Sequence, residues 1–280
     1  GIFLAATFVL ILGAIDDKFE LDAVTKLAGQ ALAGGILLLN GVQVLWLPIN
    51  GVVILPANIG QLLTVIIVVV IINAVNFIDG LDGLAVGVVA IAASCFFAFS
   101  YLLAVLNGFT RAGAPSLMTV ILVGLCVGFL AHNAYPARMF MGDSGSMFLG
   151  LMLAASAITL TGQIDANALS EENGRSTLVP LLLPFAVLAI PLLDLMWAVV
   201  RRARSGKSPF APDKLHLHHR LLDTGNSQTR TAIVLYLWTA TFAVPVTIAA
   251  FAPLWIALLI GVILLALSYF SRKREYSFSE

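Results

Sequence analysis

The sequence predicts an all-α protein, a polytopic membrane bundle of about nine helical spans. Of its 280 residues, 60% are hydrophobic and 11% are charged, whereas about a quarter of a typical soluble domain is charged. The apolar runs are long and continuous, unlike the short alternating segments of a membrane β-barrel. No internal repeat or domain boundary is evident, so residues 1–280 are expected to form a single integral membrane domain.

Each apolar run is expected to form one span, because a hydrocarbon core of ~30 Å needs about 20 apolar residues in a helix. The runs lie at Ile2–Ile15, Leu27–Leu47, Ile59–Asn73, Leu84–Leu106, Leu117–Asn133, Met147–Thr161, Leu178–Val200, Ala232–Ala250 and Leu254–Phe270. The first run is short, with no basic region before it and no small-residue cleavage site after it. We therefore interpret it as the remnant of a membrane helix and not as a signal peptide, which predicts that N-terminal spans are missing.

Positive charge divides the loops between these runs into two sets. The first set consists of Asp16–Lys26, Asn73–Gly83, Ala134–Ser146, Arg201–Thr231 and the tail Ser271–Glu280. The second set consists of Pro48–Gly60, Asn107–Ser116, Gly162–Thr177 and the turn at Pro253. Of the 15 Lys and Arg residues, only Arg111 and Arg175 lie in the second set. The positive-inside rule then places the first set and the C-terminus in the cytoplasm, and the uncharged Pro48–Gly60 becomes an extracytoplasmic loop or small hairpin.

The segment NAVNFIDGLDGLAVG, residues 73–87, carries a dense group of polar side chains between two apolar runs. Asn76, Asp79 and Asp82 follow one another at intervals of three, so they would line one face of a helix. The glycines favour a broken helix, in which the same side chains can still converge. Acids that cap a helix are the structural alternative. Polar groups at the edge of a bilayer are costly, which favours a functional site.

Two further polar segments are expected on the same side of the membrane. Asp16 and Asp17 are adjacent carboxylates, followed by Lys26; such a pair can bind a divalent metal or supply a base, and it can equally be a solvated helix end. In MFMGDSGS, residues 139–146, Asp143 is a hard oxygen ligand suited to Mg²⁺, and the N–H groups after it could hold phosphate oxygens. The structural alternative is that Asp143 or Ser144 caps the helix that follows.

The longest loop, residues 201–231, is basic and contains His216, His218 and His219. Basic groups beside the bilayer attract phosphates, although the positive-inside rule alone explains the arginines. No cysteine or further histidine nearby completes a zinc site, so the histidines are predicted to contact phosphate or to handle protons. Asp194 lies within an apolar run, and its role stays open, with a structural polar contact slightly favoured.

Together these groups suit a reaction between a phosphorylated lipid and a soluble, phosphate-bearing metabolite. Mg²⁺ between carboxylates and phosphates would neutralise charge during transfer. A carboxylate could deprotonate the attacking phosphate or act as the nucleophile itself, and spacing alone does not decide between these roles. A transporter or lipid scramblase is the alternative class, but the polar residues gather at one face and not at the midplane.

Four segments resemble the signature segments of the polyprenyl-phosphate N-acetylhexosamine-1-phosphate transferases. They are AIDDKFELDAVTKLAGQ, NAVNFIDGLDGLAVG, FMGDSGSMFLG and SPFAPDKLHLHHRLL. The last is most similar to the WecA/TagO branch, which joins undecaprenyl phosphate to GlcNAc-1-phosphate from UDP-GlcNAc and releases UMP. The resemblance implies eleven helices in the full-length family, with a cytoplasmic C-terminus. Other UDP-sugars, including UDP-MurNAc-pentapeptide, stay open as donors.

The resemblance also implies roles for individual residues. The catalytic positions are Asp16, Asp17 and Asp79, and the metal positions are Asn76 and Asp143. The substrate positions are Lys26, Asp82, Asn133, His216, His218, His219 and Arg220. The implied cofactor is Mg²⁺, with Mn²⁺ as a substitute. The implied partners are undecaprenyl phosphate, a UDP-sugar, membrane lipids and a second copy of the chain, without nucleic acid, in the bacterial inner (cytoplasmic) membrane with the active site on its cytoplasmic face.

Overall fold

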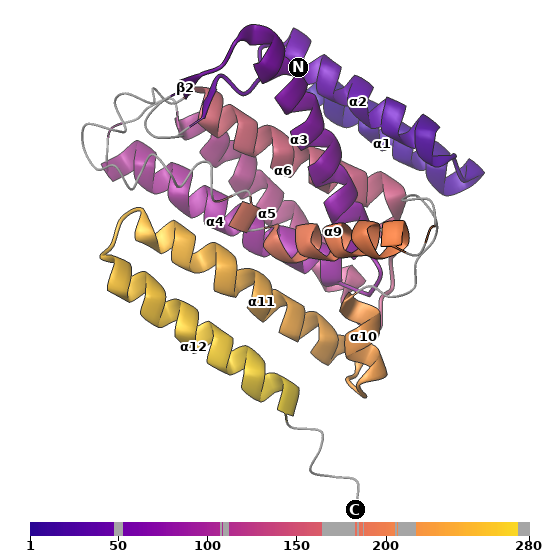
Figure 1. Ribbon diagram of the computed structural model, residues 1–280, viewed down its shortest axis with the longest axis vertical. Coiled ribbons are helices and arrows are strands. Elements are labelled where there is room, and N and C mark those ends of the chain that lie inside the picture. Colours follow the sequence, from indigo (N-terminus) through magenta and orange to yellow (C-terminus); the bar gives the residue numbers. More distant parts are fainter. Residues whose placement is uncertain are drawn as a thin grey trace, which may run out of the picture.

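The described residues of the computed structural model form a bundle of helices (Figure 1). The structure describes residues 1–47, 53–106, 108, 112–163, 183, 185–186, 188–204, 206 and 217–273. The helices are α1 (Ile2–Phe19), α2 (Ala23–Leu39), α3 (Ala57–Ile78), α4 (Leu84–Leu106), α5 (Gly113–Asn133), α6 (Gly142–Gln163), α9 (Ala189–Arg204), α10 (Leu217–Asp223), α11 (Gln228–Ala249) and α12 (Leu254–Lys273). Two short strands, β1 (Trp46–Leu47) and β2 (Val53–Ile54), also occur in this part of the chain. The predicted class, a polytopic helical bundle, is confirmed.

Six helices in the described part of the chain are long and apolar enough to cross a membrane. They are α3, α4, α5, α6, α11 and α12, and each overlaps an expected span. The predicted start of the sixth span at Met147 is wrong, because α6 begins at Gly142. Helices α1, α2 and α9 overlap the other three expected spans, but α1 ends in three charged residues, α2 has 17 residues and α9 has 16. The chain is therefore a multi-pass membrane protein, and the total of about nine spans stays a prediction.

Helix α6 lies at the centre of the bundle. It contacts α1, α3, α4 and α5, and 78% of its segment Gly142–Thr161 is buried, against 11% for the corresponding segment of α12. A Cβ at Gly150 would lie 2.7 Å from the Cα of Ile72 in α3, and one at Gly13 in α1 would lie 2.3 Å from the Cα of Ser144. Small residues at such crossings let the backbones approach closely, and here they fix the start of α6 beside the end of α1.

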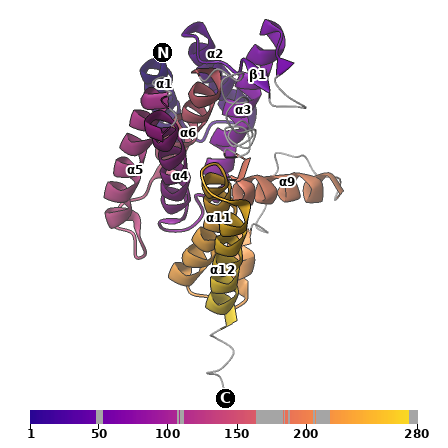
Figure 2. The same ribbon diagram turned by 90° about the vertical axis from the view of Figure 1, so that its left-hand side faces the viewer.

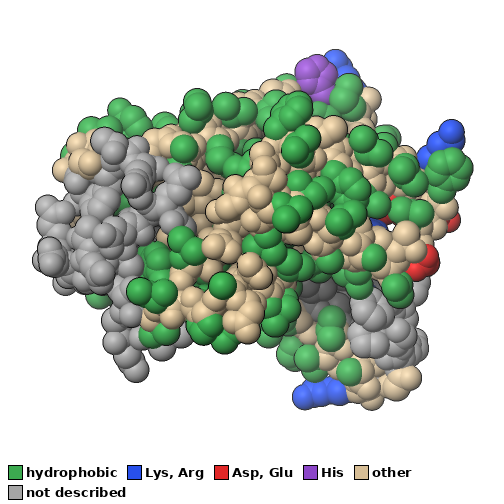
Figure 3. Space-filling view, turned by 90° about the horizontal axis from the view of Figure 1, so that it is seen from above, with side chains coloured by type: hydrophobic (Ala, Val, Ile, Leu, Met, Phe, Trp, Pro, Cys, Tyr) green, Lys and Arg blue, Asp and Glu red, His purple; other side chains and the backbone are tan. Residues whose placement is uncertain are grey.

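The outer helices turn apolar side chains away from α6. Figure 2 shows α9 projecting sideways from the bundle, while α11 and α12 pack against each other. On the face seen in Figure 3 the described side chains are mainly hydrophobic, and acidic side chains appear near one edge. Trp255, Leu258 and Val262 of α12 are all more than half exposed. A helix with such a surface suits contact with lipid.

Helix α2 begins and ends earlier than the apolar run Leu27–Leu47 predicts. It begins at Ala23 because the carboxylate of Asp22 accepts hydrogen bonds from the N–H groups two and three residues further on. It ends at Leu39, and Gly41, with φ at 78°, turns the chain. The predicted helical end at Leu47 is wrong, because apolar residues continue from the helix into the strand β1.

The small hairpin expected near Pro48–Gly60 is confirmed by the pairing of β1 with β2. The two strands run antiparallel, with Trp46 opposite Ile54 and Leu47 opposite Val53. Residues 48–52 between them lie outside the described part of the chain. The hairpin precedes α3, whose opposite end carries the polar residues.

Helix α3 continues past the predicted end at Asn73 to Ile78, so that prediction is wrong. The helix accommodates its amides because each has a partner: Asn73 Nδ2 donates to Val69 O at 2.8 Å and to Gln30 of α2, and Asn76 Nδ2 donates to α6. Residues 79–83 form the turn to α4. The glycines therefore separate two helices and do not break one.

Six helix ends meet on one side of the bundle. Helices α1, α3 and α5 end there, and α2, α4 and α6 begin there. Because consecutive helices run in opposite directions, segments that are far apart in the sequence come together at these ends. The three aspartate-containing segments found in the sequence all lie at them.

Candidate active site

A cavity of about 640 Å³ lies among these helix ends. Eight of the predicted site residues line it: Asp16, Asp17, Lys26, Asn76, Asp79, Asp82, Asn133 and Asp143. They come from four separate segments of the sequence. The convergence of the three aspartate-containing segments, which the sequence analysis expected on one side of the membrane, is thus a feature of the structure.

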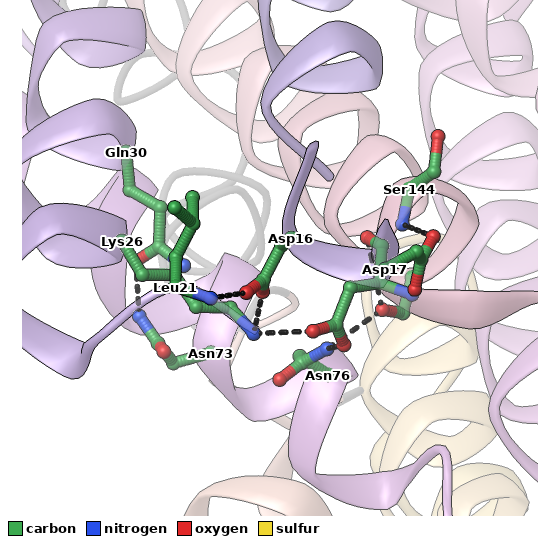
Figure 4. A network of polar contacts seen from close by, with 10 residues as sticks. Asp16, Asp17, Leu21, Lys26, Gln30, Asn73, Asn76 and Ser144 are labelled. Carbon is green, nitrogen blue, oxygen red and sulfur yellow. Dashed lines mark hydrogen bonds and ion pairs between the residues drawn. The ribbon is translucent and has the colours of Figure 1, made fainter. Parts of the chain in front are cut away.

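Lys26 joins two carboxylates from different helices. Its Nζ lies 2.5 Å from Asp16 Oδ2 at the end of α1 and 2.6 Å from Asp143 Oδ2 at the start of α6 (Figure 4). Asp16 is 5% exposed, and its other oxygen accepts a hydrogen bond from Leu21 N at 2.9 Å. Glu20, which caps α1 in the left-handed region with φ at 51°, turns the chain so that Leu21 can make this contact.

Asn76 supports the other side of Asp143. Its Nδ2 donates to Asp143 Oδ1 and, at 2.8 Å, to the hydroxyl of Ser146, which is fully buried on the next turn of α6. Both oxygens of Asp143 are therefore engaged, one by an amide of α3 and the other by the ammonium of Lys26. The carboxylate is held at a defined place on the cavity wall.

Asp17 caps the N-terminus of α6 from another helix. Its Oδ1 accepts from Asp143 N at 2.7 Å and its Oδ2 accepts from Ser144 N at 3.1 Å (Figure 4). The structural alternative, in which Asp143 or Ser144 caps this helix, does not hold, because the cap comes from α1. Of the N–H groups after Asp143 that were considered for phosphate binding, that of Ser144 is occupied by Asp17 and that of Gly145 by Met141 O. A Cβ at Gly142 would lie 2.8 Å from Asp17, which explains a glycine there.

Among the aspartates that line the cavity, Asp79 differs because no hydrogen bond to its side chain exists among the described residues. It lies in the turn after α3 and is half-buried. Burial, and then the negative charges of Asp143 and Asp17, raise the pKa of Asp79 from 3.8 to about 7. A carboxylate with a pKa near neutrality can take up and release a proton under physiological conditions.

Asp82 and Asn133 hold the loop between α5 and α6. Asp82 Oδ2 accepts from Ala137 N at 3.0 Å. Asn133 is 4% exposed, accepts from Gly83 N at 3.0 Å and donates to Met139 O at 2.8 Å. Both side chains also line the cavity, so their contacts within the protein shape its wall.

Two neighbouring contacts were not foreseen in the sequence. Gln30 of α2 is fully buried and accepts a hydrogen bond from Asn73 (Figure 4). Tyr236 of α11 donates its hydroxyl hydrogen to Gly83 O and packs where a Cβ at Gly87 would stand. A lone Gln or Tyr inside an apolar run is a weak signal, whereas its pairing with a polar turn becomes evident once the helices are packed.

The histidine side chains of the sequence motif lie outside the described residues. His216 lies outside the described residues, and His218 and His219 lie on α10, with side chains that are also outside them. Arg220 is exposed on the same helix and does not line the cavity. The side chain of Asp194, on α9, is not described either. The roles predicted for these histidines stay predictions.

The donor set of the cavity fits a magnesium ion that also binds substrate. No three His, Cys, Asp or Glu side chains of the described residues gather closely enough to hold a metal alone. Mg²⁺ is usually bound by one or two carboxylates, with waters and substrate phosphates completing its shell. Asp143 and Asn76 suit this arrangement, and the Asn76 amide oxygen makes no hydrogen bond within the described part of the chain. Hard oxygen donors of this kind suit Mg²⁺ or Mn²⁺.

The part of the sequence that forms the cavity matches a known family. The sequence profile described as "Glycosyl transferase family 4" matches residues 1–161, more than half of the chain. All eight cavity residues named above lie within the match. The chain therefore belongs to glycosyl transferase family 4.

Curated relatives support the branch suggested by the motifs. Decaprenyl-phosphate N-acetylglucosaminephosphotransferase of Mycobacterium tuberculosis is 43% identical over 248 residues, 87% of this chain and 61% of the relative. A probable undecaprenyl-phosphate N-acetylglucosaminyl 1-phosphate transferase of Bacillus subtilis is 32% identical over 53% of this chain and 38% of its own length. A phospho-N-acetylmuramoyl-pentapeptide-transferase of Desulforudis audaxviator is 34% identical over 82% of this chain and 67% of its own length. The chain spans less than two thirds of the length of the mycobacterial relative.

Proposed function

We propose that the protein to which this chain belongs transfers a sugar 1-phosphate, GlcNAc-1-phosphate, from a UDP-sugar to a polyprenyl phosphate and releases UMP. The observation that carries this proposal is the gathering of Asp16, Asp17, Asp79, Asp143 and Lys26 in one cavity at the helix ends on one side of the bundle. Such a site can bring the phosphate of a membrane lipid beside the diphosphate of a soluble nucleotide. The mycobacterial relative's name supports both the polyprenyl phosphate and the N-acetylglucosamine phosphate.

Asp143 and Asn76 would hold Mg²⁺, for which Mn²⁺ is a substitute. The ion would neutralise the charge of the transferring phosphates. The protein's own contribution is to fix the two ligands: Asp17 holds the first turn of α6, which carries Asp143, and Ser146 holds the amide of Asn76. No three acidic, histidine or cysteine side chains of the described residues gather closely enough to hold the ion alone, so the nucleotide phosphates would supply further ligands.

Asp79 is the general base in this proposal. In the transfer, an oxygen of the lipid phosphate forms a bond to the β-phosphorus of the UDP-sugar, and the bond from that phosphorus to the bridging oxygen breaks. UMP leaves with the bridging oxygen, and the proton of the lipid phosphate moves to Asp79. Its pKa of about 7 suits this exchange. Asp16 and Asp17, the other predicted catalytic carboxylates, are engaged by Lys26 and by α6, which favours supporting roles for them.

A covalent route is the alternative mechanism. There an aspartate attacks the UDP-sugar first and forms an aspartyl intermediate, which the lipid phosphate then resolves. Such an intermediate predicts exchange of labelled UMP into UDP-GlcNAc in the absence of lipid. No exchange, together with full transfer when lipid is present, supports the direct route.

The decisive experiment uses the full-length protein with Mg²⁺, radiolabelled UDP-GlcNAc and either decaprenyl or undecaprenyl phosphate. We expect UMP release and label in the lipid phase, both abolished by EDTA. Asp143→Asn should abolish the reaction, and Asp79→Asn should lower its rate by about 10²–10⁴-fold. Ser146→Ala, which removes one hydrogen bond to the amide of Asn76, should retain most of the activity. Full catalysis by both aspartate variants would overturn the site assignment.

The same assay separates the remaining alternatives. Activity with UDP-MurNAc-pentapeptide and none with UDP-GlcNAc would change the sugar and keep the chemistry, as the Desulforudis relative's name suggests. No turnover with any UDP-sugar, combined with lipid movement across vesicles, would favour a transporter or scramblase. We further propose that the site faces the cytoplasm of a bacterial inner membrane, since the distribution of Lys and Arg in the sequence predicts this side for the loops that carry it. A homodimer is proposed from the family resemblance alone.

A further inference from the structure

We propose that Lys26 is a built-in cation that occupies the metal position while no substrate is bound, and that it must leave Asp143 before a divalent cation can bind. The inference rests on the proposed function, because it takes Asp143 as a metal ligand. It assigns Lys26 a role that differs from simple contact with phosphate. It also predicts that metal and nucleotide bind in a coupled way.

The position of the ammonium group carries the inference. Lys26 Nζ lies 2.5 Å from Asp16 Oδ2 and 2.6 Å from Asp143 Oδ2, between carboxylates that come from α1 and α6. Two carboxylates so placed repel each other, and Asp16 is 5% exposed, so water screens them poorly. A cation between them relieves this repulsion, and in the absence of metal the lysine supplies it.

A divalent ion and this ammonium cannot share the place. Mg²⁺ binds carboxylate oxygens at about 2.0–2.1 Å, whereas Lys26 already contacts Oδ2 and Asn76 contacts Oδ1 of Asp143. A metal on Oδ2 would bring a double positive charge next to the ammonium. The repulsion is relieved when Lys26 withdraws from Asp143.

The cavity offers Lys26 another partner. The residue lies in the first turns of α2, its side chain is 18% exposed and it lines the cavity of about 640 Å³. Its long, flexible stem lets the ammonium move while the helix stays in place. The diphosphate of a nucleotide in the cavity would attract it, and Asp143 would then be free for metal.

Coupling between the two ligands follows. Each ligand removes part of the cost that the other must meet, so nucleotide raises metal affinity and metal raises nucleotide affinity by the same factor. Loss of Lys26 should therefore tighten metal binding to the substrate-free protein and weaken the coupling. A lysine that only contacts phosphate would leave metal binding in the absence of substrate unchanged.

The test measures Mg²⁺ affinity of the full-length protein by titration calorimetry, without substrate and then with a saturating non-transferable UDP-sugar analogue. Lys26→Met and Lys26→Gln should bind Mg²⁺ about 10-fold more tightly than the wild type without nucleotide. The analogue should then strengthen metal binding less in these variants than in the wild type. Mg²⁺ should also raise their melting temperature more than it raises that of the wild type, because the metal replaces the missing cation.

Lys18→Met is the matched control. Lys18 is exposed on the same helix end as Asp16, with its Nζ 5.2 Å from the ring centre of Phe19, and it is not part of the cavity wall. Its loss removes one positive charge near the site without freeing Asp143. Equal tightening in Lys18→Met, or unchanged or weaker Mg²⁺ binding in both Lys26 variants, overturns the inference while the proposed function stands. No Mg²⁺ binding in any variant overturns both.

Discussion

Asp79 is the one aspartate of the cavity whose side chain makes no hydrogen bond within the described part of the chain, and its protonation should control the reaction. Burial raises its pKa to about 7, so below that pH it is protonated and cannot act as a base. A bound metal lowers the pKa, because it favours the ionised form. The pH profile of kcat should therefore have an acidic limb with its midpoint at or below pH 7. Below that midpoint, kcat should fall about 10-fold per pH unit. Asp79→Asn should lower kcat by about 10²–10⁴-fold and remove this limb.

The comparison variant is Asp82→Asn, because Asp82 lies close by in the sequence but uses its carboxylate to hold Ala137 N. It should lose activity while it keeps the pH dependence of the wild type. The measurement is kcat against pH at saturating substrates. An unchanged acidic limb in Asp79→Asn would exclude Asp79 as the base.

At the scale of single residues, the sequence predicted which side chains belong to the site better than what each one does. Asp16, Asp17, Asn76, Asp79 and Asp143 were expected and line one cavity. Their pairing was not predictable, because Lys26 and Asp143 are separated by 117 positions and meet only when α2 and α6 both pack against α1 and α3. The roles of the individual aspartates therefore differ because their burial and their bonding partners differ, and no local sequence pattern reveals either.

Helix α6 depends on a carboxylate from another helix. Asp17 accepts hydrogen bonds from two of the N–H groups that have no partner within the helix at its N-terminus. Its negative charge also suits the positive end of the helix dipole. Asp17→Ala should cost about 1 kcal/mol of stability and expose the first turn of α6. Hydrogen exchange at the amides of Asp143 and Ser144 should accelerate, while exchange in the centre of α6 stays slow.

Asp17→Asn tests whether the cap needs charge or only an acceptor. Its amide keeps one oxygen, so it should restore part of the protection at one of the two N–H groups. If Asp17 acted as the nucleophile alone, both variants would abolish transfer without altering exchange in α6. That result would refute the capping role.

The crossing of α1 and α6 is as close as backbone allows. A Cβ at Gly13 would lie 2.3 Å from the Cα of Ser144, which is backbone and cannot move aside. Gly13→Ala should therefore destabilise the protein by about 1–3 kcal/mol and displace the first turn of α6, which carries Asp143. Gly35→Ala is the matched control: nothing lies within 4 Å of its added Cβ, so the variant should be neutral or more stable. Melting temperature and Mg²⁺ affinity measure the two effects.

At the scale of helices, hydrophobicity located the elements and misplaced several of their ends. The apolar run that includes Leu47 merges a helix with a strand, because both are buried in the same environment and length alone separates them. Asn73 and Asn76 looked like the end of a helix, yet they pair with neighbouring helices and α3 continues through them. Partners on other elements, which the sequence does not show, decide where these helices end.

The orientation of the whole molecule can be tested on the first helical pair. Lys18 lies near the C-terminal end of α1, and Asn40 directly follows the C-terminal end of α2. The two exposed residues therefore lie at opposite ends of this helical pair. The distribution of basic residues places Lys18 inside and Asn40 outside. Cys95 and Cys126 are buried, so they should stay unreactive in the folded protein. We expect a membrane-impermeant maleimide to label Asn40→Cys in intact cells, and Lys18→Cys only after the membrane is opened.

Cysteines outside residues 1–280 should be replaced first, so that the label reports these positions alone. The two variants also control for each other, because exposure is similar and only the side of the membrane differs. Labelling of Lys18→Cys in intact cells, with Asn40→Cys protected, would invert the orientation and place the cavity outside. A site on that side would have no access to a cytoplasmic nucleotide sugar, so this single reversal would remove the donor from the proposed reaction.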